Sequence, residues 1–208
     1  MDYTVLKQNN LVPQEWMEIL QHFSDYNHSY AEQYAKKNKY YDCAYWYNEI
    51  TNVGVVACGI SKANGFSLVE YVSKKGSGRG YSGRRDLYFN YNGLDGVCEA
   101  KFDWVKLSSK LDTNKKTITK SIQEADKNMR DSLNKHTSAT FGASICFFPI
   151  YYKNSTNVVR AIEEIDSLFE QLILCDYTIK IHHLNNVIRS ESGNSYVGLY
   201  VCGNIYQK

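Results

Sequence analysis

Apolar residues recur along the chain at two spacings, which together predict a mixture of helices and strands. In the first 40 residues, which are predicted to be helical, Trp16, Leu20 and Phe23 follow the three-to-four spacing of an amphipathic helix. The same spacing predicts helices over about residues 42–63, 115–133 and 157–174. Alternating or continuous apolar runs bounded by turn residues predict strands over about residues 66–73, 86–91, 97–104, 140–151, 177–182 and 196–205. This order predicts an α/β fold with a central mixed β-sheet flanked by helices.

The second and third predicted strands form a hairpin that places acidic and basic residues on one face. If Asn92-Gly93 makes a two-residue turn, Tyr91 pairs with Leu94, and Asp86 is then opposite Glu99. Because side chains alternate between the faces of a strand, Lys101 shares the face of Glu99. A longer turn would shift Asp86 towards Lys101 or Asp103.

Two carboxylates and a lysine on one sheet face suit metal-dependent hydrolysis of phosphodiesters. Carboxylates bind Mg²⁺, the metal polarises a phosphate and activates a water, and a lysine orients that water or stabilises developing charge. Asp86, Glu99 and Lys101 are candidates for these roles. The alternative is an ordinary cross-strand salt bridge on a solvated face.

The same residues resemble a known family. Asp86 is followed by twelve residues and then by Glu99-Ala100-Lys101, and Gly83-Arg84-Arg85-Asp86-Leu87 resembles the run that introduces a catalytic aspartate. This pattern is similar to that of the PD-(D/E)xK nuclease superfamily, which has the restriction-endonuclease-like fold. Many members add a glutamate from the first core helix, and Glu49 occupies that place. No proline precedes Asp86, which is a departure from the commoner pattern.

The resemblance implies a restriction-endonuclease-like nuclease domain over residues 41–208, preceded by an N-terminal helical extension over residues 1–40. It implies a Mg²⁺-dependent deoxyribonuclease, with Mn²⁺ as a substitute. In this interpretation Asp86 and Glu99 coordinate the metal, Glu49 assists, and Lys101 positions the water. DNA is the expected substrate, RNA stays open, and a homodimer or a partner subunit is compatible with the sequence.

Charge along the chain also favours a polyanionic ligand. From Lys62 to Lys120, twelve basic residues outnumber six acidic ones, whereas the whole chain has a net charge of +2. The glycine-rich loop in this region is predicted to contact a phosphate backbone, and a plain flexible hairpin loop is the alternative. The candidate nucleic-acid-binding residues are Lys74, Lys75, Arg79, Arg84 and Arg85.

Two other functions remain open. One is a catalytically inactive nucleic-acid- or protein-binding module on the same fold. The presence of Asp86, Glu99 and Lys101 argues against it, because a decayed site usually loses one member. The other is an interaction protein with an unrelated α/β fold. Glu70, which shares a strand face with apolar residues, is a further candidate for the site because a carboxylate among apolar neighbours needs a partner.

Composition narrows the class of protein. The 208 residues are 43% hydrophobic, which is enough for a sizeable core, and no apolar run is long enough to span a membrane. Six dispersed cysteines form no C-x-x-C pair, so zinc-ribbon and thioredoxin-type motifs are unsupported. Reduced thiols and the lack of a secretory signal predict a cytoplasmic protein that does not contact membranes.

Overall fold

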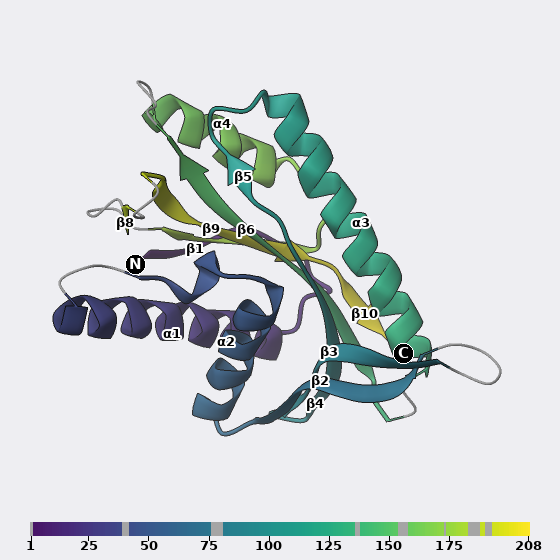
Figure 1. Cartoon of the computed structure of the whole chain (residues 1–208). Coiled ribbons are helices and arrows are strands. Elements are labelled where there is room, and N and C mark those ends of the chain that lie inside the picture. The colour runs from purple at the N-terminus through teal and green to yellow at the C-terminus, as the bar shows by residue number, and fades with distance from the viewer. Residues whose placement is uncertain are drawn as a thin grey trace.

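The structure, a computed structural model, describes residues 2–38, 42–75, 81–135, 138–153, 158–172, 174–182, 188–189 and 193–208. For residues 2, 73–75, 81–83, 135 and 188–189 it describes the backbone alone. The described residues form an α/β fold in which four helices flank one mixed sheet (Figure 1).

The strands join in the order β1-β7-β9-β6-β4-β3-β2, with β10 and β5 paired to β6 and β8 paired to β9. Along this order only β4 and β6 run parallel, and α3 connects them. The strands are β1 (Asp2–Gln8), β2 (Phe66–Lys75), β3 (Tyr81–Tyr91), β4 (Leu94–Phe102), β5 (Val105–Lys106), β6 (Phe141–Tyr152), β7 (Tyr177–His182), β8 (Ile188–Arg189), β9 (Ser195–Gly203) and β10 (Ile205–Gln207).

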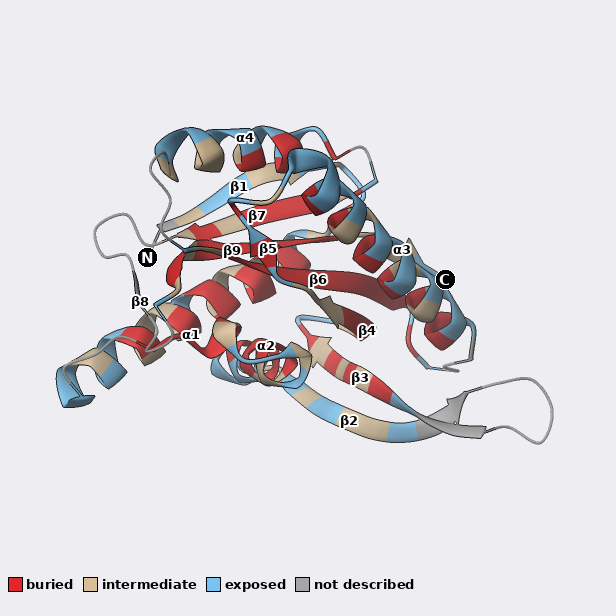
Figure 2. Ribbon diagram, turned by 45° about the horizontal axis from the view of Figure 1, so that its top comes forward, coloured by how far each residue is buried: buried red, intermediate tan, exposed pale blue. Residues whose placement is uncertain are grey.

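Two helices cover each face of the sheet. The helices are α1 (Gln14–Asn38), α2 (Glu49–Lys62), α3 (Leu111–Lys135) and α4 (Val158–Glu170), with a short 3₁₀ helix η1 (Ala44–Trp46) before α2. Helices α1 and α2 pack on one face, and α3 and α4 pack on the other. Central strands are therefore buried on both faces, as Figure 2 shows for β6, β7 and β9.

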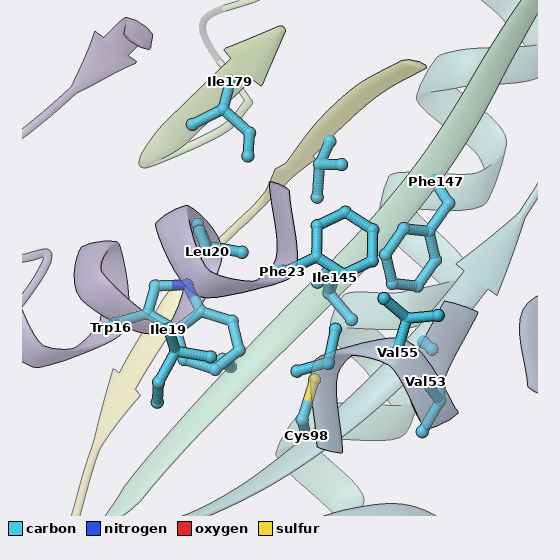
Figure 3. Packing of buried hydrophobic residues seen from close by; sticks show 14 of the residues in the cluster. Trp16, Ile19, Leu20, Phe23, Val53, Val55, Cys98, Ile145, Phe147 and Ile179 are labelled. Carbon is cyan, nitrogen blue, oxygen red and sulfur yellow. The ribbon is translucent and has the colours of Figure 1, made fainter. Parts of the chain in front are cut away.

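The main core lies between α1, α2 and the sheet. Figure 3 shows Trp16 and Phe23 of α1 directed towards the sheet, where Phe23 meets Phe147 at a ring-centroid distance of 5.6 Å. Val53 of α2 belongs to the same buried cluster. Because every predicted apolar position of α1 lies in this core, the amphipathic pattern directly determined which face of the helix packs.

The N-terminal segment differs from its prediction. Residues Asp2–Gln8 form strand β1, which pairs antiparallel with β7, where the apolar spacing predicted a helix. The segment is short, and its strand conformation depends on a partner that lies some 170 residues later in the sequence. Helix α1, in contrast, is confirmed, as are α3 and α4 within a few residues at their ends. Helix α2 ends as predicted but begins at Glu49, about seven residues later than predicted, because residues Ala44–Trp46 form the 3₁₀ helix η1. The long strands β2, β3, β4, β6, β7 and β9 are confirmed as well.

No helix among the described residues is both long and apolar enough to cross a membrane. All six cysteines are free thiols, and five of them are buried.

Candidate active site

The hairpin of β3 and β4 has the predicted two-residue turn. Asn92 and Gly93 have φ of 48° and 83°, the left-handed values that such a tight turn requires. The register therefore runs from Tyr91 opposite Leu94 to Leu87 opposite Cys98, as the turn residues predicted.

Asp86 lies one residue beyond this paired stretch and interacts with the neighbouring strand through its side chain. Its Oδ2 accepts a hydrogen bond from the backbone N–H of Ala100 at 2.7 Å. A side-chain carboxylate thus satisfies a backbone donor of β4, which fixes the position of Asp86 beside the Glu99-Ala100-Lys101 segment.

Lys101 and Glu49 meet at the start of α2, although 52 residues separate them in the sequence. The Nζ of Lys101 is 3.3 Å from Oε2 of Glu49 and donates to the carbonyl of Ala100 at 2.7 Å. Asn48 begins α2, since its side chain accepts a hydrogen bond from the backbone N–H of Thr51. Glu49 then occupies the first turn, where the helix dipole favours a carboxylate.

The pKa of Glu49 is raised above its ordinary value of 4.5. Burial is the largest cause, and the neighbouring charges of Asp86 and Asp103 raise the pKa further, whereas Lys101 lowers it. Two carboxylates and one lysine thus change the pKa of Glu49 in opposite directions.

The raised pKa predicts how stability depends on Glu49. Below pH 4.5 the Glu49 carboxyl is protonated in both the folded and the unfolded chain, so it does not affect the stability of the fold through its charge. As the pH rises through the folded-state pKa, the buried carboxyl becomes charged, and this charge lowers the free energy of unfolding. Glu49→Gln is therefore expected to unfold at a higher temperature than wild type at pH 7.5 in EDTA, with the difference disappearing at pH 3.5. Thermal unfolding monitored by circular dichroism measures both values.

Glu163→Gln on the exposed surface of α4 is the matched control and should show no pH-dependent difference. A Glu49→Gln variant that is less stable than wild type at pH 7.5 would mean that the ion pair with Lys101 outweighs the burial of Glu49.

Glu99 lies on the α3 side of the sheet. The residue is only 2% exposed, and its Oε1 accepts a hydrogen bond from the hydroxyl of Ser132 on α3. The structure therefore pairs Lys101 with Glu49 at the start of α2 and holds Asp86 against the backbone of Ala100, while the Glu99 carboxylate is held against α3.

An unexpected backbone conformation explains the surroundings of Glu99. Glu70 in β2 has φ of 49°, a left-handed value that non-glycine residues rarely adopt in a strand. Beyond it, Tyr71 packs edge-on against Tyr88, the residue that Phe66 also contacts. Phe66 and Tyr71 are an odd number of residues apart, so the alternation of faces shifts by one position at Glu70.

Arg85 is the residue most affected by this shift. It pairs with Tyr71 across the strands, is only 1% exposed, and has Nε and Nη1 atoms that form no hydrogen bond with any described residue. The pKa of Tyr71 is raised, mainly by burial; Arg85 lowers it and Glu99 raises it, which places the three side chains near one another. Arg85 is therefore part of a buried polar group beside β4, and the prediction that it grips a phosphate backbone is wrong for this conformation.

Among the other predicted nucleic-acid contacts, the structure describes the side chain of Arg84. Arg84 is exposed and forms an ion pair with Glu70 at 3.3 Å, so the Glu70 carboxylate has a partner at the surface. The side chains of Lys74, Lys75 and Arg79 lie outside the described residues.

Sequence reasoning missed Asp103 as a neighbour of the candidate site. Asp103 follows Lys101 by two residues, raises the pKa of Glu49, and accepts a hydrogen bond from the hydroxyl of Ser121 on α3. Its position on the same strand face as Lys101 was the available signal.

The donor set can be tested against the Mg²⁺ that the resemblance implies. Within the part of the chain that the structure describes, no three acidic, histidine or cysteine side chains are grouped so that they could hold a metal ion by themselves. Mg²⁺ is commonly bound by one or two carboxylates, several waters and substrate phosphates. Asp86 and Glu49 fit that smaller requirement, and their side chains lie close enough for the charge of Asp86 to raise the pKa of Glu49.

No family model, no curated protein and no solved structure matches the chain.

Proposed function

We propose that this protein is a metal-dependent nuclease with a restriction-endonuclease-like fold that hydrolyses phosphodiester bonds in DNA. The observation that carries the proposal is that Asp86 is held against the backbone of Ala100, next in the chain to Lys101, which forms an ion pair with Glu49. Carboxylates and a lysine at one place supply the metal ligands and the cation that phosphodiester hydrolysis needs.

The order of elements supports the same proposal. Apart from the two-residue strand β5 between β4 and α3, the chain runs α2-β2-β3-β4-α3-β6-α4, with β6 parallel to β4. The resemblance implies the same order of helix, three strands, helix, strand and helix. Asp86 lies on the second strand of this series, and Glu99 and Lys101 lie on the third.

Each side chain has a defined task in this proposal. Asp86 and Glu49 would hold Mg²⁺, which when bound lowers the pKa of a water and polarises the scissile phosphate. Lys101, which already lies beside Glu49, would stabilise the negative charge that develops on the phosphate oxygens and orient the water. Glu99 would join the metal ligands only by leaving Ser132, so we assign it a structural role in the present conformation.

A second candidate function is a nucleic-acid-binding module that has lost catalysis. The burial of Glu99 against Ser132 favours it, because this carboxylate is a metal ligand in the pattern that the sequence resembles. The two candidates differ in whether the chain cuts DNA.

Cleavage of supercoiled and linear DNA, with RNA as a parallel substrate, tests the proposal. Wild type is expected to cut DNA with Mg²⁺ or Mn²⁺ and not with EDTA. Asp86→Asn should bind Mg²⁺ roughly tenfold more weakly or worse in calorimetry. It should still fold, because an amide oxygen can also accept the hydrogen bond from Ala100.

Asp131→Asn on the exposed surface of α3 is the matched control and should cut like wild type. Failure of wild type to cut DNA and to bind Mg²⁺ would overturn the proposal in favour of the binding module. Cutting that persists in Asp86→Asn at the wild-type rate would move the reaction to another site.

A further inference from the structure

A cluster of aromatic side chains borders the candidate active site at the end of the sheet where β4 and β6 finish and β9 begins. The aromatic edge, as we name it, consists of Trp46, Phe102, Trp104, Tyr151 and Tyr196. The five rings come from η1, β4, the connection after β4, β6 and β9. The catalytic proposal uses none of them.

The rings form one continuous group. Trp46 stacks on Tyr196 with centroids 4.4 Å apart, and Tyr196 meets Trp104 at 5.7 Å. Trp104 also contacts Phe102 at 5.4 Å and Tyr151 at 5.6 Å, in both cases edge to face. Its neighbours thus support the Trp104 ring on several sides, and 37% of the residue remains exposed to solvent.

The aromatic edge touches both arms of the candidate site. Trp46 precedes Glu49 by three residues at the start of α2, and Trp104 follows Lys101 by three residues at the end of β4. Glu49 and Lys101 are themselves 3.3 Å apart. The aromatic edge therefore begins next to the place where the scissile phosphate would bind.

Exposed lysines lie beside the rings. Lys106 of β5 pairs with Tyr151 of β6, which in turn pairs with Tyr196 of β9. Lys153 follows Tyr151 by two residues and is also exposed. Neither lysine forms an ion pair with a residue that the structure describes. The positive charge at this edge is thus available to an anionic ligand.

Trp104 is the exposed ring of this group, and Tyr196 beneath the cluster is buried. An exposed aromatic ring flanked by uncompensated lysines is a combination that binds single-stranded nucleic acid, because a base stacks on the ring while cations track the phosphates. A duplex hides the faces of its bases inside the stack, so an exposed tryptophan on a sheet edge gains little from it. Of the predicted backbone contacts whose side chains the structure describes, Arg84 is paired with Glu70 and Arg85 is buried, so neither of these two arginines supplies free charge for a phosphate backbone.

We propose that the aromatic edge binds unpaired bases of a DNA strand next to the scissile phosphate, with Trp104 as the main stacking residue. This inference rests on the proposed nuclease function for its substrate class. It specifies that the preferred substrate contains a single-stranded region.

Binding without cleavage tests the inference. Fluorescence anisotropy in EDTA compares a labelled single-stranded DNA oligonucleotide with the same sequence as a duplex. Wild type is expected to bind the single strand more tightly. Trp104→Leu, which keeps an apolar side chain against Phe102 and Tyr151, should weaken single-strand binding by roughly fivefold to a hundredfold and leave duplex binding unchanged.

Two variants guard against misinterpretation. Trp104→Phe retains an aromatic face and should recover most of the affinity that Trp104→Leu loses. Phe66→Ala removes an exposed aromatic residue from β2 and should bind like wild type. Equal single-strand affinity in wild type and Trp104→Leu, or preference of wild type for the duplex, would overturn the inference. Binding of the matching RNA strand more than tenfold tighter than DNA would overturn the assignment to DNA.

The outcome is separable from the proposed catalysis. Metal-dependent DNA cleavage by wild type, together with equal single-strand affinity in wild type and Trp104→Leu, would retain the nuclease and discard the stacking site. Loss of single-strand binding in Trp104→Leu, in a protein that cuts nothing with Mg²⁺, would retain the stacking site and discard the nuclease.

Discussion

Lys101→Ala is expected to lower metal-dependent DNA cleavage by roughly a hundredfold or more, the loss that follows removal of one group that stabilises transition-state charge. The ammonium of Lys101 lies 3.3 Å from Glu49, where charge would develop on the phosphate. Mg²⁺ binding should survive, because a lysine ammonium is not a metal ligand. Single-turnover cleavage rates and calorimetry with Mg²⁺ measure the two effects separately.

Lys120→Ala is the matched control for this substitution. Lys120 is exposed on α3 and forms a solvent-exposed pair with Glu124, so its loss should leave cleavage unchanged. Cleavage by Lys101→Ala at the wild-type rate would reduce the role of Lys101 to neutralising Glu49. Loss of folding in the variant would appear in circular dichroism and would be distinguished from loss of catalysis.

Trp16→Ala is expected to lower the free energy of unfolding by about 3–5 kcal/mol, the range for deleting a large aromatic side chain from a core. Trp16 has no exposed surface and joins α1 to three strands. Its ring contacts those of Phe89 at 5.6 Å, Phe141 at 5.9 Å and Tyr177 at 6.0 Å. Urea unfolding measures the change.

Val159→Ala, at an exposed position of α4, should change the free energy of unfolding by no more than about 0.5 kcal/mol. A loss of less than about 1 kcal/mol in Trp16→Ala would mean that α1 does not hold the sheet together. That outcome would support the prediction that residues 1–40 are an extension of a domain formed by residues 41–208. A loss in the expected range would make α1 part of the same folding unit as β3, β6 and β7.

In the two proposals the candidate site and the aromatic edge are parts of one binding surface. The carboxylates and Lys101 occupy the start of α2 and the end of β4, and the rings continue from there across β6 and β9. A strand with unpaired bases on Trp104 would thus have a phosphate near Lys101. The combination predicts a nuclease for frayed, nicked or otherwise unpaired DNA.

Local sequence determined the hairpin and most of the elements. Asn92-Gly93 requires a tight turn whatever surrounds it, and the alternation of apolar residues decides which strand face is buried, so the register followed without tertiary information. The helices α1 to α4 followed in the same way from their apolar spacing. The position of Asp86 next to the Glu99-Ala100-Lys101 segment was therefore predictable from neighbouring residues alone.

Contacts between distant segments were decided only by the tertiary structure. The contact of Lys101 with Glu49 needs α2 to pack beside β4, and the strand conformation of β1 needs β7 as its partner. The left-handed conformation of Glu70 shifts the alternation of faces in β2, and with it the buried position of Arg85. The spacing of apolar residues and the chemistry of turns act over a few residues, so the sequence by itself determined the hairpin. Burial depends on which surfaces the whole chain brings together, so only the tertiary structure decided which charged side chains face solvent.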